Sequence, residues 1–258
     1  MEGFTDTITL TFGEQAENHA GMEILGHGVA NEGFTIQDLE WMKERFEEHH
    51  KGCAIFHLGE FSGVDNAPDA AILVVSGGVE CLLDGYTADD LYAEQKSFHW
   101  DTKAKMRGRV VNKRARYNLC FDDQARGPDY ENGKGTIIGY DQAPLTAITK
   151  RRLPDFIGPK SEDLQLEGNY YYGPNCGIGY HGDSERKKVV GVRLGASMPL
   201  RYLWFQNSKP VGNYAEIILN HGDLYVMSEK ATGFDWKKRK IMTLRHAAGC
   251  KKYVEYKE

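Results

Sequence analysis

A series of short β-type segments in the second half of the chain constrains the fold most. Separated by stretches rich in Gly, Asn and Asp, they lie at residues 164–166, 189–194, 200–205, 215–219, 224–227, 241–244 and 253–256. Many short strands joined by turn residues are typical of two packed sheets, as in a sandwich or jelly roll. Helical signals are sparse in this part, with a weak one at 144–153.

The first hundred residues predict a small acidic α+β region. Residues 7–12 alternate like a strand, and 53–58, 71–75 and 79–83 are short apolar β runs. Thr35 and Thr87 stand where the N-caps of two helices are expected. Residues 1–100 hold 19 acidic and 4 basic side chains, whereas residues 101–258 hold 18 acidic and 28 basic ones. We therefore expect an α+β protein with an N-terminal region at 1–100 and a β domain at 101–258.

Composition excludes several classes of protein. The chain is 41% hydrophobic and 27% charged, which is ordinary for a globular protein. No stretch approaches the roughly 20 apolar residues of a membrane span, and the opening residues lack the pattern of a secretory signal. Five cysteines form no CxxC pair, so we expect reduced thiols in an intracellular compartment, cytoplasmic or nuclear. No obligate protein partner is evident.

One motif in the β region carries metal-binding chemistry. His181 and Asp183 are two residues apart in an extended segment, so their side chains point to the same side and can bind one ion. With a second histidine from elsewhere they would form a facial triad, a set that holds Fe(II) and leaves coordination positions open. By itself the tripeptide is also compatible with a polar turn.

The surrounding sequence makes the metal interpretation stronger. The stretch 169–185 (NYYYGPNCGIGYHGDSE) closely resembles the AlkB family of Fe(II)/2-oxoglutarate dioxygenases, which show N-x-Y, then I-G, then H-x-D-x-D/E at this spacing. Residues 190–197 and 219–228 resemble core strands of that family. The resemblance covers about 165–258, with the basic segment 103–117 as a possible extension. It implies a double-stranded β-helix, or jelly-roll, core.

The resemblance implies roles for individual residues. His181 and Asp183 would be iron ligands, and Asn169 and Tyr171 would hydrogen-bond 2-oxoglutarate, which is consumed together with O2. Glu185 matches the acidic position that faces the substrate base. For Asn169 and Tyr171, plain strand packing is the alternative.

The third metal ligand departs from the family pattern, since its usual distance from the Gly-Asp turn leads to Lys237. Two histidines remain as candidates. His221 immediately precedes Gly222-Asp223, where a turn is expected, and we interpret it as structural. His246 ends an apolar segment, and we expect it to complete the triad.

The cation for the distal carboxylate of 2-oxoglutarate is the second departure. Arg239 and Arg245 fit the R-x5-R spacing of the family, but this register leaves no distal histidine before Arg239. Arg245 and His246 are adjacent and would face opposite sides of a strand. If His246 is the ligand, Lys251 or Lys252 would bind the carboxylate.

The basic segment 103–117 suggests the substrate. It contains seven bases and no acid just before the β core, where the AlkB family carries its nucleotide-recognition lid. Arg114, Arg116 and Tyr117 are expected to contact phosphates and stack on a base. The leading hypothesis is therefore an enzyme that demethylates alkylated nucleobases in DNA or RNA. The alternatives are a hydroxylase of protein side chains or small metabolites, and a non-enzymatic β-sandwich binding module.

Overall fold

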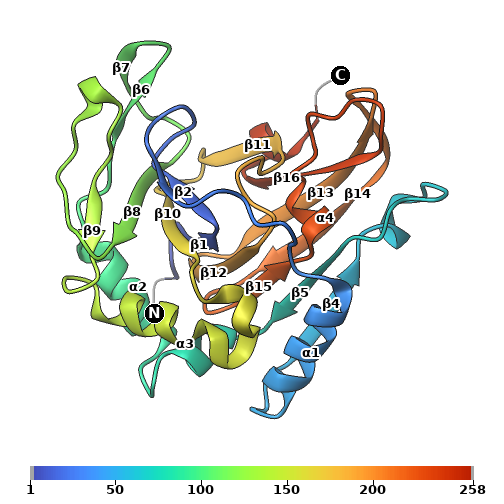
Figure 1. The fold of residues 1–258 in the computed structure, drawn as a ribbon, viewed down its shortest axis with the longest axis horizontal. Coiled ribbons are helices and arrows are strands. Elements are labelled where there is room, and N and C mark those ends of the chain that lie inside the picture. The colour runs from blue at the N-terminus through green and yellow to red at the C-terminus, as the bar shows by residue number, and fades with distance from the viewer. Residues whose placement is uncertain (1–2, 257–258) are drawn as a thin grey trace.

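An eight-stranded sheet is the largest unit of the computed structural model, which describes residues 3–256 (Figure 1). From edge to edge its strands are β4 (Cys53–His57), β5 (Ala71–Val75), β15 (Leu224–Met227), β12 (Val189–Gly195), β1 (Thr7–Gly13), β10 (Gln165–Tyr171), β8 (Tyr117–Asp122) and β9 (Ile137–Gly139). Neighbours are antiparallel except β8 and β9, which run parallel. The N-terminal strand β1 thus lies near the middle of the sheet.

A second, antiparallel sheet of four strands faces the large one. Its order is β11 (Gly177–His181), β16 (Thr243–Gly249), β13 (Met198–Gln206) and β14 (Lys209–Leu219). A shared apolar cluster joins the two sheets, with Tyr225 and Met227 from the large sheet and Leu200, Trp204 and Leu244 from the small one. Two further hairpins are formed by β2 (Gln15–Glu17) with β3 (Ile24–Gly26) and by β6 (Lys103–Met106) with β7 (Arg109–Asn112).

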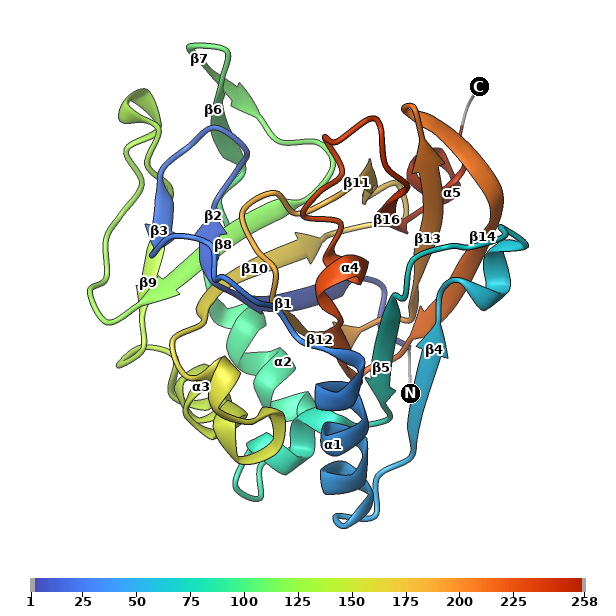
Figure 2. The same cartoon turned by 45° about the vertical axis from the view of Figure 1, so that its right-hand side comes forward.

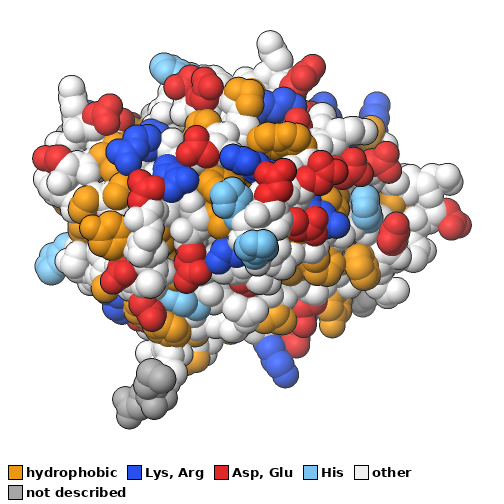
Figure 3. All heavy atoms as spheres, turned by 90° about the horizontal axis from the view of Figure 1, so that it is seen from below, with side chains coloured by type: hydrophobic (Ala, Val, Ile, Leu, Met, Phe, Trp, Pro, Cys, Tyr) orange, Lys and Arg blue, Asp and Glu red, His pale blue; other side chains and the backbone are white. Residues whose placement is uncertain are grey.

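Helices cover the other face of the large sheet. These are α1 (Ile36–Glu47), α2 (Ala88–Ser97) and α3 (Pro144–Ile157), seen below the sheet in Figures 1 and 2. Their buried residues, such as Leu39, Leu91 and Phe156, pack in one core with Leu10 and Val192 of the sheet. On the molecular face seen from below, acidic and basic side chains are interspersed (Figure 3).

Period-two alternation decides which side chains leave this core. In β1 the apolar residues Ile8, Leu10 and Phe12 belong to the helix-side core. Thr9 and Thr11 alternate with them and face the small sheet, where they line a cavity. The same alternation in β10 and β12 turns Asn169 and Arg193 toward that cavity. A row of polar side chains is therefore presented between the two sheets.

Several predicted elements are confirmed. Thr35 and Thr87 cap α1 and α2, each through a capping box. The strands predicted at 7–12, 53–58 and 71–75 correspond to β1, β4 and β5, and the weak helix at 144–153 is α3. Shorter helical elements are η1 (Glu60–Ser62), η2 (Gly78–Leu82), η3 (Tyr130–Asn132), η4 (Pro159–Ser161), α4 (Glu229–Thr232) and α5 (Lys251–Val254).

Two predicted strands are wrong. The run 79–83 is the 3-10 helix η2, which follows Gly77 at a φ of 59° and buries Val79 and Leu82 three residues apart. The run 253–256 falls on the helical turn α5, where Gly249 at a φ of 109° ends β16. In both places a glycine in the left-handed region redirects the chain. In η2 the apolar residues are buried at helical rather than strand spacing, and in α5 only Val254 is buried.

The predicted boundary at residue 100 crosses a continuous sheet. Strands β1, β4 and β5 come from residues 1–100. Of these, β1 pairs with β10 and β12, and β5 pairs with β15, all three from residues 101–258. The protein is a mixed α+β structure built mostly of strands in several sheets. Within residues 3–256 the strand order of each sheet is linear, so no sheet closes on itself. No helix in this range is long and apolar enough to cross a membrane.

Candidate metal centre

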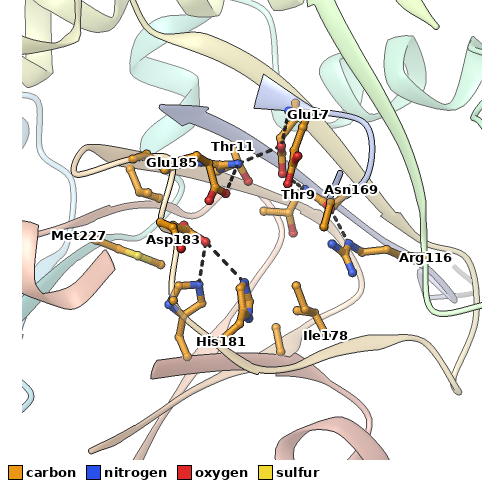
Figure 4. A pocket seen from close by; sticks show the side chains of 18 of the residues that line it. Thr9, Thr11, Glu17, Arg116, Asn169, Ile178, His181, Asp183, Glu185 and Met227 are labelled. Carbon is orange, nitrogen blue, oxygen red and sulfur yellow. Dashed lines mark hydrogen bonds and ion pairs between the residues drawn. The ribbon is translucent and has the colours of Figure 1, made fainter. Parts of the chain in front are cut away.

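Three predicted metal ligands meet at one end of the small sheet. His181 ends β11 and is the register partner of His246 in β16, and Asp183 follows two residues after His181. One ligand atom from each residue lies within 4.8 Å of the other two. The Asp183 Oδ1 atom is 3.5 Å from Nε2 of His181 and 3.7 Å from Nε2 of His246 (Figure 4). The prediction that these three residues form one cluster agrees with this geometry.

Backbone contacts fix the orientation of the first imidazole. The β11–β16 register shifts between Ile178 and His181, and this irregularity brings the Gly179 carbonyl within 2.8 Å of His181 Nδ1. A carbonyl only accepts, so Nδ1 of the neutral ring donates and the Nε2 lone pair faces Asp183. A hydrogen bond of this kind typically orients a metal-binding histidine.

The charge states of the three side chains suit a cation. Burial lowers the pKa of His181, and it lowers the pKa of His246 to about 3, so both rings are neutral at neutral pH. Burial alone would raise the pKa of Asp183, but the positive charge of Arg186 opposes it, and the pKa lies below its usual value. Two neutral imidazoles and one carboxylate are the forms in which these groups bind metals.

The loop between the ligands is held by close backbone packing. A Cβ atom at Gly182 would lie 2.1 Å from the Gly233 carbonyl oxygen and 2.7 Å from Trp236, so glycine is required there. The Asp183 amide donates to the Thr232 carbonyl at 3.0 Å. The segment after α4 therefore buttresses the loop that presents Asp183.

The other candidate histidine has a structural role, as expected. Nδ1 of His221 accepts a hydrogen bond from the Gly195 amide at 2.8 Å, and its Nε2 atom lies 3.3 Å from Asp89. Its ring stacks on Phe4. His221 thus holds the turn before β15 and is not a member of the cluster.

The cluster lines a cavity of about 490 Å³ between the two sheets, here called the central cavity. Its walls come from both sheets, from the 17–21 turn and from the segment after α4. Four further residues predicted from the sequence line it, namely Asn169, Tyr171, Glu185 and Arg116. Figure 4 shows Arg116, Asn169 and Glu17 across the cavity from the His181 side.

Hydrogen bonds order the polar wall of the cavity. The side-chain oxygen Oδ1 of Asn169 accepts hydrogen bonds from Nε of Arg116 at 2.6 Å and from Nδ2 of Asn118 at 2.8 Å. Arg186 is buried and donates to Glu167 at 2.9 Å, with Glu185 3.4 Å away. Burial and then the charge of Asp183 raise the pKa of Glu185 to about 7, although Arg186 opposes this shift.

Other predicted binding residues do not line the central cavity. Arg114 is exposed, and Tyr117 stacks on Tyr172 with ring centroids 4.1 Å apart. Tyr117 alternates with Arg116 along the chain, so it faces away from the cavity when Arg116 faces into it. Neither residue therefore lines the cavity that holds the cluster.

The predicted cations for the 2-oxoglutarate carboxylate are also elsewhere. Lys251 and Lys252 are exposed on α5, because the chain turns at Gly249 instead of continuing as a strand beside the cavity. Arg245 faces away from His246 and lies over Phe205 and Trp236, with its guanidinium carbon 4.0 Å and 5.1 Å from the two ring centroids. Lys251, Lys252 and Arg245 do not line the cavity, and neither does Arg239.

Comparison with known proteins identifies a viral relative. No protein-family model matches the chain. The chain is 44% identical over 259 residues to the uncharacterized protein R156 of Acanthamoeba polyphaga mimivirus, which covers 99% of this chain and 100% of the viral protein. The chain belongs to the family of this mimivirus protein. The match spans both the N-terminal strands of this chain and the region of the cluster.

Sequence reasoning missed part of the cavity in this member of the mimivirus protein family. The 17–21 turn contributes Glu17 and His19 to the cavity, although the sequence predicts no candidate site residue within residues 1–100. Arg193 and Thr9 line the cavity from the large sheet. A signal was present for Arg193, since it is a lone charge in the apolar strand VVGVRLG. The arrangement combines a cluster that could hold a metal ion with a polar wall that has both donors and acceptors.

Proposed function

We propose that this protein is an Fe(II)- and 2-oxoglutarate-dependent dioxygenase that oxidises alkylated nucleobases in DNA or RNA. The observation that carries the proposal is the cluster of His181, Asp183 and His246 in a cavity that Asn169 and Tyr171 also line. The cluster and this wall come from different sheets and face one cavity, and this arrangement supports the proposal.

The donor set fits a metal of this kind. Two imidazole nitrogens and one carboxylate oxygen leave coordination positions for other ligands, as in non-haem Fe(II) oxygenases. Nδ1 of His246 is buried and has no hydrogen-bond partner among residues 3–256. The polar contacts of this ring are therefore directed to Asp183 and to any ion that the cluster binds.

The path of the chain supports a jelly-roll core. From β10 onward it alternates between the sheets except at the hairpin β13–β14: β10, β12 and β15 belong to the large sheet, and β11, β13, β14 and β16 to the small one. Such alternation is what a double-stranded β-helix requires. In this interpretation β1 is an additional strand inserted between β10 and β12.

The protein's contribution to the reaction is binding and orientation. When bound, Fe(II) together with 2-oxoglutarate and O2 supplies the oxidation of a C–H bond. His181, Asp183 and His246 would hold the metal at the edge of the small sheet. The amide of Asn169 and the hydroxyl of Tyr171 would donate hydrogen bonds to the oxoacid, and the apolar cluster between the sheets would exclude water.

The mouth of the cavity favours a planar, polar group on a polyanion. Glu185 offers a carboxyl with a pKa near 7, which can donate to or accept from a base edge. Trp236 offers an aromatic face, and Arg116 and Lys237 offer positive charge. A base in a duplex would have to be flipped out to reach this depth.

Succinate formation tests the proposal. Protein loaded anaerobically with Fe(II) is given 2-oxoglutarate and air with methylated single-stranded oligonucleotides, or with methylated peptides in parallel. We expect succinate and demethylated base from the oligonucleotides, and neither from the Asp183→Ala variant. Turnover with peptides alone would support the hydroxylase of protein side chains. No succinate above the variant's background with any substrate would refute the dioxygenase.

A further inference from the structure

Arg193 lies in the middle of the large sheet and is 1% exposed. It is the register partner of Thr9, which in turn pairs with Asn169 on the other side of β1. These three residues therefore form a row across β10, β1 and β12, and all three line the central cavity. The guanidinium is thus held by the sheet and directed at the space between the two sheets.

The guanidinium of Arg193 forms no ion pair among the residues that the structure describes, and the charge of Asp223 acts on it only from beyond ion-pair distance. Within residues 3–256 its Nε and Nη1 atoms have no hydrogen-bond partner, and no carboxylate lies within 4.0 Å of it. Burial lowers its pKa, but a guanidinium stays protonated at neutral pH. An unpaired buried charge is strongly unfavourable. Arg193 therefore lowers the free energy of unfolding unless a bound ligand compensates its charge.

The neighbouring Arg186 shows how this cavity otherwise treats a buried guanidinium. It is also buried, but it is paired with Glu167 at 2.9 Å and lies 3.4 Å from Glu185. The charge of Arg186 is thus paired with carboxylates of the protein, whereas that of Arg193 is not.

The groups around Arg193 are also hydrogen-bond donors. Thr9 Oγ1 is buried without a hydrogen-bond partner among residues 3–256. The charges of Tyr171 and Tyr225 are close enough to influence the Arg193 pKa. Burial raises the pKa of both phenols, to about 12 for Tyr225, so their hydroxyls remain protonated. A guanidinium and three hydroxyls together match a ligand group that is an anion and an acceptor.

We propose that Arg193, with Thr9, Tyr171 and Tyr225, binds a carboxylate of the ligand and so makes the central cavity selective for dicarboxylates. The second carboxylate would lie toward the metal cluster. That the ligand is 2-oxoglutarate rests on the proposed function, whereas the anion site itself rests on the unpaired guanidinium. The anchor then comes from β12, a strand between the N-terminal strand and β15, and not from the last strand or α5.

Ligand binding to metal-free protein tests the anion site without any turnover. Thermal unfolding is followed with succinate, 2-oxoglutarate, butyrate or inorganic phosphate for the parent and for Arg193→Met. We expect the two dicarboxylates to raise the Tm of the parent more than butyrate does. Arg193→Met should have an unliganded Tm equal to or above that of the parent, and no shift with any anion. Arg245→Met, an arginine outside the cavity, should keep the parent's anion response.

Several results would overturn the proposal. An Arg193→Met variant that keeps the dicarboxylate shift is one, and equal stabilisation of the parent by butyrate and succinate is another. A shift with phosphate alone would likewise exclude a dicarboxylate site. If Arg193→Met does not fold, Arg193→Lys retains the charge and loses the planar fork, and its Kd for succinate should rise by about tenfold. An unchanged Kd there would also reject the site.

This experiment separates the two proposals. If dicarboxylates bind through Arg193 and no succinate is ever formed from 2-oxoglutarate, the anion site stands and the dioxygenase fails. If succinate is formed and Arg193→Lys leaves the KM for 2-oxoglutarate unchanged, the dioxygenase stands and the anchor is another residue.

Discussion

The two ends of the central cavity treat electric charge differently. At the metal end, formed by His181, Asp183 and His246, the imidazoles are neutral and Arg186 lowers the pKa of the carboxylate. At the anion end, formed by Thr9, Tyr171, Arg193 and Tyr225, a buried guanidinium has no carboxylate partner within residues 3–256. The metal end is therefore nearly balanced before anything binds, while the anion end is complete only with a ligand.

The ends also differ in how they are encoded. Two of the metal ligands stand two residues apart on one extended segment, so the period of a strand predicts that they cooperate. The anion end depends on the pairing of β1 between β10 and β12, which makes Thr9 the register partner of Arg193 and brings the strand of Tyr171 beside them. Local spacing carries no information about such pairing.

The largest expected effect is at the metal end. His246→Ala removes one of the three donors and should weaken Fe(II) binding by more than about 100-fold, beyond what loss of an outer-shell partner costs. Asp183→Ala should do the same. Equilibrium dialysis with Fe(II) under anaerobic conditions measures the loss.

The matched control is the histidine outside the cluster. His221→Ala removes the acceptor for the Gly195 amide but leaves the cluster intact, so it should retain the parent's Fe(II) affinity. Full iron occupancy in His246→Ala would show that the metal site lies elsewhere. Anion binding at Arg193 should survive in both variants, which keeps the two ends experimentally separate.

The second effect concerns the loop that presents Asp183. Gly182→Ala puts a Cβ atom 2.1 Å from a backbone oxygen, and this cannot be relieved by a side-chain rotation. We expect a loss of about 1–3 kcal/mol in the free energy of unfolding, typical of overpacking, together with weaker Fe(II) binding. Urea unfolding and dialysis measure the two quantities. Gly179→Ala, where a Cβ would meet its nearest atom at 4.0 Å, is the control, and equal behaviour of the two variants would count against this account.

The fold was predictable to the extent that alternation and capping describe it. The strands at 7–12 and 71–75 and the helices capped by Thr35 and Thr87 follow from local patterns. Strand order does not, because β1 joins the centre of the sheet between β10 and β12, two strands that lie far from it in the sequence. The separation at residue 100 rested on charge, and charge describes surfaces rather than strand pairing.

The predicted substrate segment shows the same limit. The sequence predicts a substrate contact from the basic segment 103–117 as a whole, yet its basic side chains have separate roles in the structure. Arg116 faces the cavity and Arg114 is exposed, whereas Lys113 donates to Asn18 and Asn118. The sequence does not reveal which basic side chain turns toward the cavity. That depends on contacts between distant segments, such as those of Lys113 with Asn18 in the 17–21 turn.

A smaller effect is expected at Lys113, behind the anion end. Its Nζ atom donates to the Asn18 carbonyl at 3.0 Å, to Asn18 Oδ1 at 2.6 Å and to Asn118 Oδ1 at 2.9 Å, and Asn118 in turn holds Asn169. Burial lowers the pKa of Lys113 to about 7, with the charge of Asp101 opposing and that of Arg116 assisting. In the unfolded chain the pKa is about 10.4.

The sign of the pH dependence follows from these two values. Between about pH 7 and 10 the unfolded chain holds the proton and the folded protein releases it, so stability rises with pH in this window. Relative to Lys113→Met, the parent should gain at most about 1.4 kcal/mol per pH unit. Urea unfolding of both proteins between about pH 7 and 9 measures the difference. A difference that is constant or falls with pH would contradict the lowered pKa.

The smallest effect is expected at the two lysines of α5, and it decides between the sequence-based and the structural assignment of the carboxylate anchor. Lys251→Ala and Lys252→Ala alter exposed side chains outside the cavity, so the Kd for succinate should stay within about twofold of the parent, the range of a screened surface charge. Had either lysine bound the carboxylate, its loss would weaken binding by about tenfold or more, since a hydrogen bond to a charged group is worth about 1.5–3 kcal/mol. Titration calorimetry with metal-free protein resolves these two values. A tenfold loss in either variant would return the anchor to the C-terminal segment and leave Arg193 as a buried charge that the ligand does not meet.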